Sequence, residues 1–331
     1  MADVKLPAGS ATATEGPRPW SRTAIGKAPP HVYFVISAVF HYLGPAFAVL
    51  LFVRVDVLGV AWLRIVSAAV IFAFWRRPWR AFLAQDRDGR RLLLAWGGVL
   101  AVMNACFYTA IDRLPLGTVA AVEFLPVIVL AALGARSVRN AAALALAVPG
   151  VYLLTDVQLS AQPLGLVFAF LNAILFAVYI VLADRVAKRP QIGGIDGLAA
   201  AMLIAAVVIT PIGGWGAVPA FSDPVGILAG IGVGVSSSVI PYVTDQLALA
   251  RLSRSTYALM VSLLPAIAAV IGVVILTQIP TASQTIGVAL VVTGIALHRE
   301  PSSDPGRESR LPTGIDAPES IAPLAAHEVG A

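Results

Sequence analysis

The sequence predicts an all-α integral membrane protein whose ten transmembrane helices form two inverted five-helix repeats. Of the 331 residues, 58% are hydrophobic and 12% are charged, and the mean hydropathy is +0.85, whereas soluble domains carry roughly 25% charge. Apolar stretches follow one another with few polar residues between them, which leaves no room for a large soluble domain. A similar segment also occurs once in each half of the chain, at a spacing of 138 residues.

Ten apolar stretches are each close to the length of about 20 residues that a helix needs to cross a bilayer. They must be helical, because unpaired backbone groups cannot face lipid. Charged and turn residues separate them, as in the run from Arg76 to Arg91. The predicted spans are residues 32–53, 57–75, 92–111, 115–135, 140–155, 163–184, 195–213, 225–247, 255–277 and 282–298.

The two ends of the chain differ in composition from the region between them. Residues 1–30 are rich in Ala, Pro, Gly, Ser and Thr and lack the apolar core of a signal peptide, which predicts a disordered cytoplasmic arm that is not cleaved. Residues 300–331 have a similar composition and are predicted to form a disordered cytoplasmic tail. The first repeat is expected to cover residues 31–156 and the second residues 157–299.

The distribution of Lys and Arg predicts the orientation, because short cytoplasmic loops carry an excess of both residues. With both termini in the cytoplasm, only Arg54 and Arg113 of the 23 basic residues fall in outside loops, and Arg64 falls within a span. The others all lie on the cytoplasmic side. This alternation favours an even number of spans.

Several classes of function lack the sequence features that they need. The basic residues are scattered in short loops, so the pI near 9.7 does not indicate a nucleic-acid partner. The single cysteine, Cys106, excludes an internal disulfide and a cysteine-rich metal site. No phosphate-binding loop, His-Glu-x-x-His motif or paired membrane aspartates occur, so no enzyme activity, metal or cofactor is expected. An intramembrane enzyme in which His41, Glu123 and Ser238 converge is the alternative.

The internal repeat is carried by residues 113–118, Arg-Leu-Pro-Leu-Gly-Thr, and residues 251–256, Arg-Leu-Ser-Arg-Ser-Thr. Each opens a span with a proline beyond its middle, Pro126 in one and Pro265 in the other. Five spans per repeat force the second copy to enter the membrane from the opposite side. In transporters, such inverted repeats hold the substrate at their interface near the bilayer midplane. A duplicated membrane scaffold is the alternative.

Three ionisable residues lie deep within predicted spans, where charge is costly and usually marks function. Glu123 suits proton coupling or a counter-charge for a substrate amine, and its structural alternative is a protonated, hydrogen-bonded carboxyl. Arg64 keeps its proton and therefore needs an anion, either a substrate carboxylate or Glu123 in a structural ion pair. His41 can titrate near physiological pH and accept protons, or it can be a packed hydrogen-bonding residue.

Uncharged polar residues in other spans complete the predicted substrate site. Several fall four or seven residues apart, which keeps a pair on one helix face. Serines can equally bond to their own backbone or allow close helix packing. Pro241 and the glycines before it predict a local break in the eighth span that exposes backbone groups to substrate. The predicted uncharged site residues are Tyr42, Asn104, Tyr108, Asn172, Tyr179, Ser238, Tyr242, Tyr257 and Ser262.

Three stretches resemble EamA-type transporters of the drug/metabolite transporter superfamily, nearest the threonine and homoserine exporter branch. Residues 107–125, from Phe107 to Leu125, are similar to the junction of that family's third and fourth helices, and residues 238–242 and 251–263 are similar to its eighth and ninth helices. The chain departs from the family pattern at Glu123-Phe-Leu-Pro126, which lacks a glycine before the proline. It also has Leu264 in place of a second membrane glutamate, and Thr277-Gln278 in place of Gly-Glu.

The resemblance implies a secondary active transporter that exports a small metabolite, such as a threonine-like or homoserine-like amino acid, by alternating access. Proton coupling through Glu123 and His41 is expected, and Arg64 with Glu123 would suit the two charges of a zwitterion. Efflux of drug-like or lipophilic solutes and a non-transporting scaffold are the alternatives. Expected partners are the substrate, protons and the lipid bilayer of a bacterial inner membrane, with a homodimer left open.

Overall fold

The computed structural model describes residues 29–134, 137–189, 192, 194–249 and 260–297, and every regular element in these ranges is helical. The predicted all-α class is therefore confirmed. The predicted terminal segments, residues 1–30 and 300–331, lie almost wholly outside the described residues. The described helices all belong to one unit, Met1–Arg299. They are α1 (Pro30–Leu51), α2 (Val57–Arg76), α3 (Pro78–Leu83), α4 (Arg87–Ile111), α5 (Leu116–Gly134), α6 (Val138–Ala161), α7 (Pro163–Ala187), α8 (Gly194–Ala217), η3 (Val218–Ser222), α9 (Pro224–Gly234), η4 (Val235–Val239), α10 (Ile240–Leu249), α12 (Leu264–Leu276) and α13 (Ala282–Leu297).

Six helical stretches are long and apolar enough to cross a membrane, and four shorter apolar helices accompany them in the described part of the chain. The six are formed by α1, α2, α4, α7, α8 with η3, and α9 continued through η4 into α10. Apolar parts of α5, α6, α12 and α13 make up the shorter set. Each of the ten predicted spans overlaps one of these stretches. Such a pattern is that of a multi-pass membrane protein.

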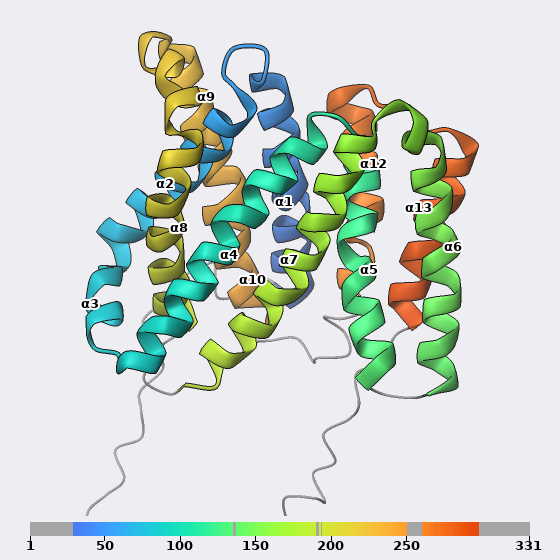
Figure 1. Ribbon diagram of the computed structural model, residues 1–331, viewed down its shortest axis with the longest axis horizontal. Coiled ribbons are helices and arrows are strands. Elements are labelled where there is room, and N and C mark those ends of the chain that lie inside the picture. Colours follow the sequence, from blue (N-terminus) through green and yellow to red (C-terminus); the bar gives the residue numbers. More distant parts are fainter. Residues whose placement is uncertain (1–28, 135–136, 190–191, 193, 250–259, 298–331) are drawn as a thin grey trace, which may run out of the picture. The chain divides into compact units, whose positions relative to one another are not determined.

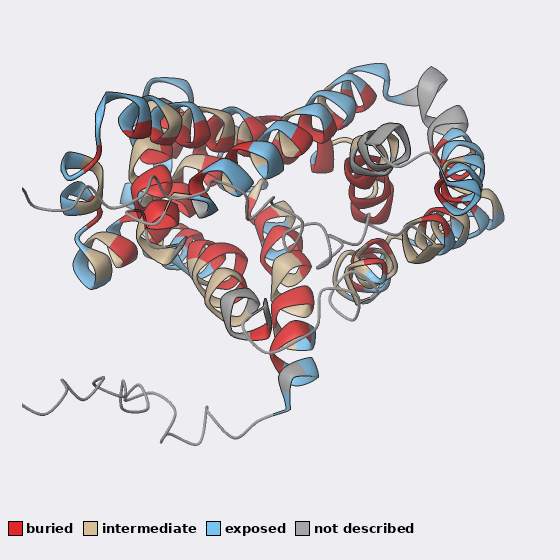
Figure 2. Ribbon diagram, turned by 90° about the horizontal axis from the view of Figure 1, so that it is seen from below, coloured by how far each residue is buried: buried red, intermediate tan, exposed pale blue. Residues whose placement is uncertain are grey.

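The outward faces of the helices are apolar, as lipid contact requires. On α7 the exposed large side chains include Val167, Ile174 and Val181, and only 28% of its most apolar stretch is buried. Figure 2 shows the buried residues on the sides of the helices that face other helices, with exposed residues on the outer sides. An apolar surface of this kind would aggregate in water, so lipid is its natural solvent.

Helix starts follow local rules that the sequence encodes. Asp56, Asp86 and Asp223 immediately precede α2, α4 and α9, and each accepts hydrogen bonds from backbone N–H groups of the first turn. The short helix α3 was not predicted. It arises because Arg77 adopts a left-handed φ of 50° that ends α2, and Pro78 then begins a new helix.

The helices of the two halves pack against one another in matched pairs. Helix α2 packs against α8, α5 against α12, and α6 against α13. Helix α4 packs against α7, and α1 packs against α9, η4 and α10 (Figure 1). Polar residues on α1, α2, α4, α5 and α7 are thereby brought towards η4 and towards one another.

The eighth predicted span contains an irregularity where a break was expected. Residues Val235–Val239 form a π-helical turn, and the N–H of Ile240 bonds to the carbonyl of Val235 five residues earlier. Pro241 follows directly and has no N–H to donate. Short π-helical turns within α-helices are frequent at functional sites.

Candidate functional site

Arg64 on α2 is held against the π-helical turn η4. Its side chain is 6% exposed, its Nε donates to Ser238 Oγ at 3.1 Å, and its Nη2 donates to the Ser237 carbonyl at 3.1 Å. That carbonyl stands four residues before Pro241, so its usual α-helical donor is missing. Arg64 therefore binds a backbone group that the proline leaves free. Its guanidinium also lies 5.5 Å from the ring centroid of Tyr108 on α4.

Small residues let η4 approach α1 and α2 this closely. A Cβ atom at Gly44 on α1 would clash with the Ser237 side chain and lie 2.8 Å from its backbone nitrogen. A Cβ atom at Gly234 would clash with Ser67 Oγ and lie 2.8 Å from the Arg64 carbonyl. Ser37 on α1 donates to the Pro241 carbonyl at 3.2 Å. The turn is thus fixed between two helices of the first half.

Glu123 on α5 forms the second charged group of the site. Asn172 Nδ2 on α7 donates to Glu123 Oε1 at 3.1 Å, and both residues are buried. The Asn172 Oδ1 atom has no hydrogen-bond partner among the described residues. The sequence predicted both residues but did not pair them.

Arg64 and Glu123 interact electrostatically but form no ion pair in the described part of the chain. The structural ion pair that was the alternative interpretation of Arg64 is therefore absent. Among the described residues, the hydrogen-bond acceptors of Arg64 are neutral oxygens, and the donor to Glu123 is the Asn172 amide. A buried charge without an opposite charge is costly, so both groups suit a ligand that carries charge.

His41 and Tyr42 on α1 interact with these two charged groups. Their ring centroids are 5.2 Å apart in an edge-to-face arrangement. His41 interacts electrostatically with Arg64, and Tyr42 with Glu123. Tyr42 is fully buried.

Several polar atoms around the two charged groups have no hydrogen-bond partner among the described residues. They are the hydroxyls of Tyr42, Tyr108 and Ser237 and the Asn172 Oδ1 atom, although the Tyr108 hydroxyl lies near Ser237 and Arg64 and interacts with both. Unsatisfied buried polar groups are rare and each costs about 1–3 kcal/mol. Their concentration beside Arg64 and Glu123 is typical of a site that a polar ligand completes.

The other predicted site residues contribute less directly. Asn104 is buried, but its amide donates to the Leu100 carbonyl of its own helix at 2.8 Å. Tyr179 stacks on Phe176 with ring centroids 6.4 Å apart. Ser262 is buried, and Tyr242 is half-buried. Tyr257 lies outside the described residues.

Ser37 and Gly44 were missed as parts of this site. Both contact the eighth span, and with His41 they fall at positions 37, 41 and 44, which share one helix face. That spacing was the available signal. A serine and a glycine are common in any membrane helix, so the spacing gained meaning only once the partner helix was known.

A cavity of about 320 Å³ lies apart from this group, where the start of α5 meets the loop between α12 and α13. Its lining is mostly apolar, with polar side chains from Thr118, Gln278 and Gln284. None of the predicted substrate residues lines it. Across the described residues, no three His, Cys, Asp or Glu side chains gather as a metal site would need.

Curated relatives match most of the chain. The threonine/homoserine exporter RhtA of Salmonella typhimurium strain SL1344 is 30% identical over 266 residues, which cover 78% of this chain and 88% of that protein. The threonine/homoserine exporter RhtA of Escherichia coli strain K12 is 30% identical over 252 residues, which cover 75% of this chain and 84% of that protein. Residues 163–299 match the EamA-like transporter family.

A crystal structure of another protein shares the fold. It superimposes with a TM-score of 0.53 at 18% sequence identity and covers 81% of this chain and 96% of its own. The helical architecture, the curated relatives and the family match agree with one another. The chain is a multi-pass membrane protein and belongs to the EamA-like transporter family, which is a family of transporters and not of enzymes.

Proposed function

We propose that ten transmembrane helices form two inverted five-helix repeats, α1 to α6 and α7 to α13. The packing supports this arrangement, because exchanging the halves turns the main contacts between them either into one another or into themselves. The contact of α4 with α7 becomes that of α1 with α9 and α10, and the contact of α5 with α7 becomes that of α1 with α12. The pairs α2 with α8, α5 with α12 and α6 with α13 map onto themselves.

The transporter works by secondary active export of a small zwitterionic amino acid, such as threonine or homoserine. One observation carries this proposal: buried Arg64 and buried Glu123 approach each other without pairing. Arg64, with the hydroxyls of Tyr108 and Ser237, offers donors for a carboxylate. Glu123 and Asn172 Oδ1 offer acceptors for an ammonium group. The relatives named above are threonine/homoserine exporters.

Proton coupling is assigned to Glu123, with His41 as a second group. The ionised carboxylate would bind the substrate ammonium group, and it would bind a proton when no substrate is present. Proton and substrate would therefore replace each other at Glu123 during the transport cycle. The protein lies in a bacterial inner membrane. Both chain termini are in the cytoplasm, an orientation that the Lys and Arg distribution supports. Export of a lipophilic solute is the competing function, and the apolar cavity at the start of α5 favours it.

Transport assays in proteoliposomes separate these roles. For the parent protein we expect uptake of labelled threonine driven by an imposed pH gradient and also counterflow without a gradient. If Glu123 carries the proton and also binds the substrate ammonium group, Glu123→Gln loses the gradient-driven uptake and retains only weakened counterflow. Arg64→Gln removes the positive charge that would pair with a substrate carboxylate, and it is expected to lose both activities.

Asp184→Asn is the matched control, because Asp184 is an exposed carboxylate whose ion-pair partner among the described residues is Lys188, one turn along the chain. It should transport like the parent. Absence of threonine and homoserine counterflow in the folded parent would contradict the amino acid proposal, and transport of labelled lipophilic cations by the same protein would then support the alternative. Complete loss of counterflow in Glu123→Gln would support its role in substrate binding without supporting its role in proton coupling, and unchanged gradient-driven uptake would contradict the coupling role.

A further inference from the structure

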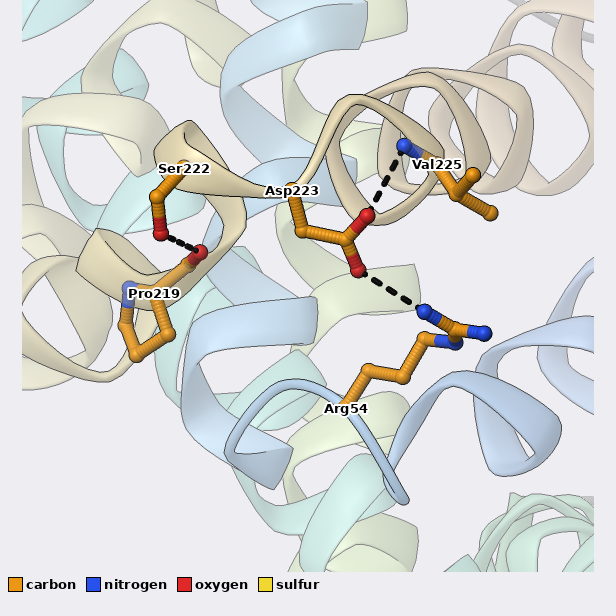
Figure 3. Close-up of polar contacts among 5 residues, drawn as sticks. All are labelled: Arg54, Pro219, Ser222, Asp223 and Val225. Carbon is orange, nitrogen blue, oxygen red and sulfur yellow. Dashed lines mark hydrogen bonds and ion pairs between the residues drawn. The ribbon is translucent and has the colours of Figure 1, made fainter.

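Two ion pairs connect the halves of the molecule in the same way. Arg54, in the loop after α1, lies with its Nη1 3.1 Å from Asp223 Oδ2 at the start of α9 (Figure 3). Arg189, in the loop after α7, lies with its Nη1 2.9 Å from Asp86 Oδ1 at the start of α4. In each case an arginine that follows the first helix of one half contacts an aspartate that caps the third long helix of the other half.

The two aspartates are built alike. Asp86 accepts from the Gly89 N–H at 2.7 Å, and Asp223 accepts from the Val225 N–H at 3.0 Å. A glycine stands three residues after each aspartate. A Cβ atom at Gly89 would lie 2.8 Å from an Asp86 oxygen, and a Cβ atom at Gly226 would lie 3.1 Å from an Asp223 oxygen. The capped carboxylates are thus held in place to receive an arginine.

Sequence spacing relates the pairs to the internal repeat. The two aspartates are 137 residues apart and the two arginines are 135 residues apart, close to the repeat spacing of 138 residues. The start of α4 and the start of α9 also lie at opposite ends of the helices (Figure 1). One pair therefore stands at each end, as an inverted repeat requires.

We propose that these two ion pairs are the gating residues of transport, and that each closes one end of the substrate pathway. The proposal rests on the inverted repeat and alternating access described above. Opening an end separates the first helix of one half from the third long helix of the other, which are the segments that each pair joins. The pairs are partly exposed, with side-chain exposures of 56% and 31% for Arg54 and Asp223 and 32% and 67% for Arg189 and Asp86, so they are weak enough to break in each cycle.

A third ion pair also joins the halves but has a different relation to the repeat. Arg76 Nε lies 2.7 Å from Asp196 Oδ1 and joins the end of α2 to the start of α8. Helices α2 and α8 are counterparts in the two halves. The equivalent ion pair in the other half would therefore join the start of α2 to the end of α8. There Asp56 lies beside Gly216, and it forms no ion pair with any described residue. The third pair is thus present at one end only.

Distance measurements between spin labels test the proposal in the full chain, with Cys106 replaced by alanine. One label pair, at the exposed positions Val53 and Ser222, reports on the end closed by Arg54. A second label pair, at the exposed positions Ala84 and Arg185, reports on the end closed by Arg189. The protein is reconstituted in lipid without substrate.

The expected result is opposite for the two arginines. Arg54→Gln should raise the population with a long Val53–Ser222 distance and lower that with a long Ala84–Arg185 distance. Arg189→Gln should do the reverse. Because a partly exposed ion pair is weak, the ratio of the two open forms should change by roughly two- to five-fold in each variant. Both variants keep the aspartate caps, so the helices should start as before.

Matched controls break ion pairs that do not join the halves. Lys188→Gln removes the contact with Asp184 within α7, next to Arg189, and Arg113→Gln removes the contact with the adjacent Asp112. Neither substitution should shift the distances. Arg54→Lys, which keeps the positive charge, should also leave the distances as they are in the parent. Unchanged distances in both Gln variants, or a shift in the same direction in both, would overturn the gates. Because the readout needs no substrate, failed threonine transport with opposite distance shifts would reject only the amino acid proposal.

Discussion

At the scale of single residues, the position of Arg64 is explained by the backbone N–H that Pro241 lacks. Because Pro241 has no N–H, the Ser237 carbonyl lacks its usual α-helical donor. It accepts a hydrogen bond from the Arg64 guanidinium instead. The arginine is then oriented by neutral oxygens, and its positive charge remains available to an anion. A direct ion pair with Glu123 would have neutralised both groups and left nothing to attract a charged substrate.

Asp86 shows how one residue combines a helix cap with an ion pair. The Gly89 N–H, and then the nearby Arg189, hold the pKa of Asp86 below its ordinary value. The unfolded chain therefore takes up this proton at higher pH than the folded chain does. The stabilisation is complete above the ordinary carboxyl pKa of about 4 and is lost as the pH falls through the lowered value.

Thermal unfolding of Asp86→Asn in detergent at several pH values tests this effect. Parent and variant should differ most near neutral pH, and the difference should vanish in acid as Asp86 becomes protonated. Asp88→Asn is the control, because Asp88 lies in the first turn of α4 and its ion-pair partner in the described part of the chain is the nearby Arg91, at 3.6 Å. A difference for Asp86→Asn that does not depend on pH would show that its carboxylate charge is unimportant.

At the scale of elements, the π-helical turn η4 depends on close contact with α1. Gly44 faces Ser237, and a methyl group at Gly44 would press against the Ser237 backbone nitrogen, which cannot move without shifting the turn. We therefore expect Gly44→Ala to destabilise the protein by about 1–3 kcal/mol, as overpacking does. Its unfolding midpoint should fall at a fixed heating rate.

Gly98 on α4 provides the control for Gly44. A Cβ atom at Gly98 would meet nothing within 4 Å, so Gly98→Ala should be neutral or should stabilise its helix by up to about 1 kcal/mol. If both substitutions raised the unfolding midpoint, the close packing of η4 against α1 would be contradicted. If both lowered it equally, glycine content in general, and not this contact, would be responsible.

At the scale of the whole molecule, orientation is set by charge in the loops. Reporter fusions after Asp56 and after Arg113 should give active alkaline phosphatase, because these loops are expected outside the cytoplasm. Fusions after Arg91 and after Lys188 should give fluorescent protein and no phosphatase activity. The reverse pattern at all four sites would invert the topology, and a mixed pattern would show that the number of spans before the fusion point is wrong.

The sequence by itself determined the helical class, the apolar segments and the family resemblance. These properties follow from local composition and spacing, as with Asp86 and Asp223, which stand directly before the helices that they cap. It also singled out Arg64 and Glu123, because a charge within an apolar stretch is visible without any knowledge of neighbours.

Only the tertiary structure decided which of these residues meet. Glu123 bonds to Asn172, 49 positions away, and Arg64 to Ser238, 174 positions away. Such contacts depend on the rotation and packing of whole helices, which local spacing does not fix. For the same reason, the gating role of Arg54 could not be inferred until the fold placed it beside Asp223, 169 positions along the chain.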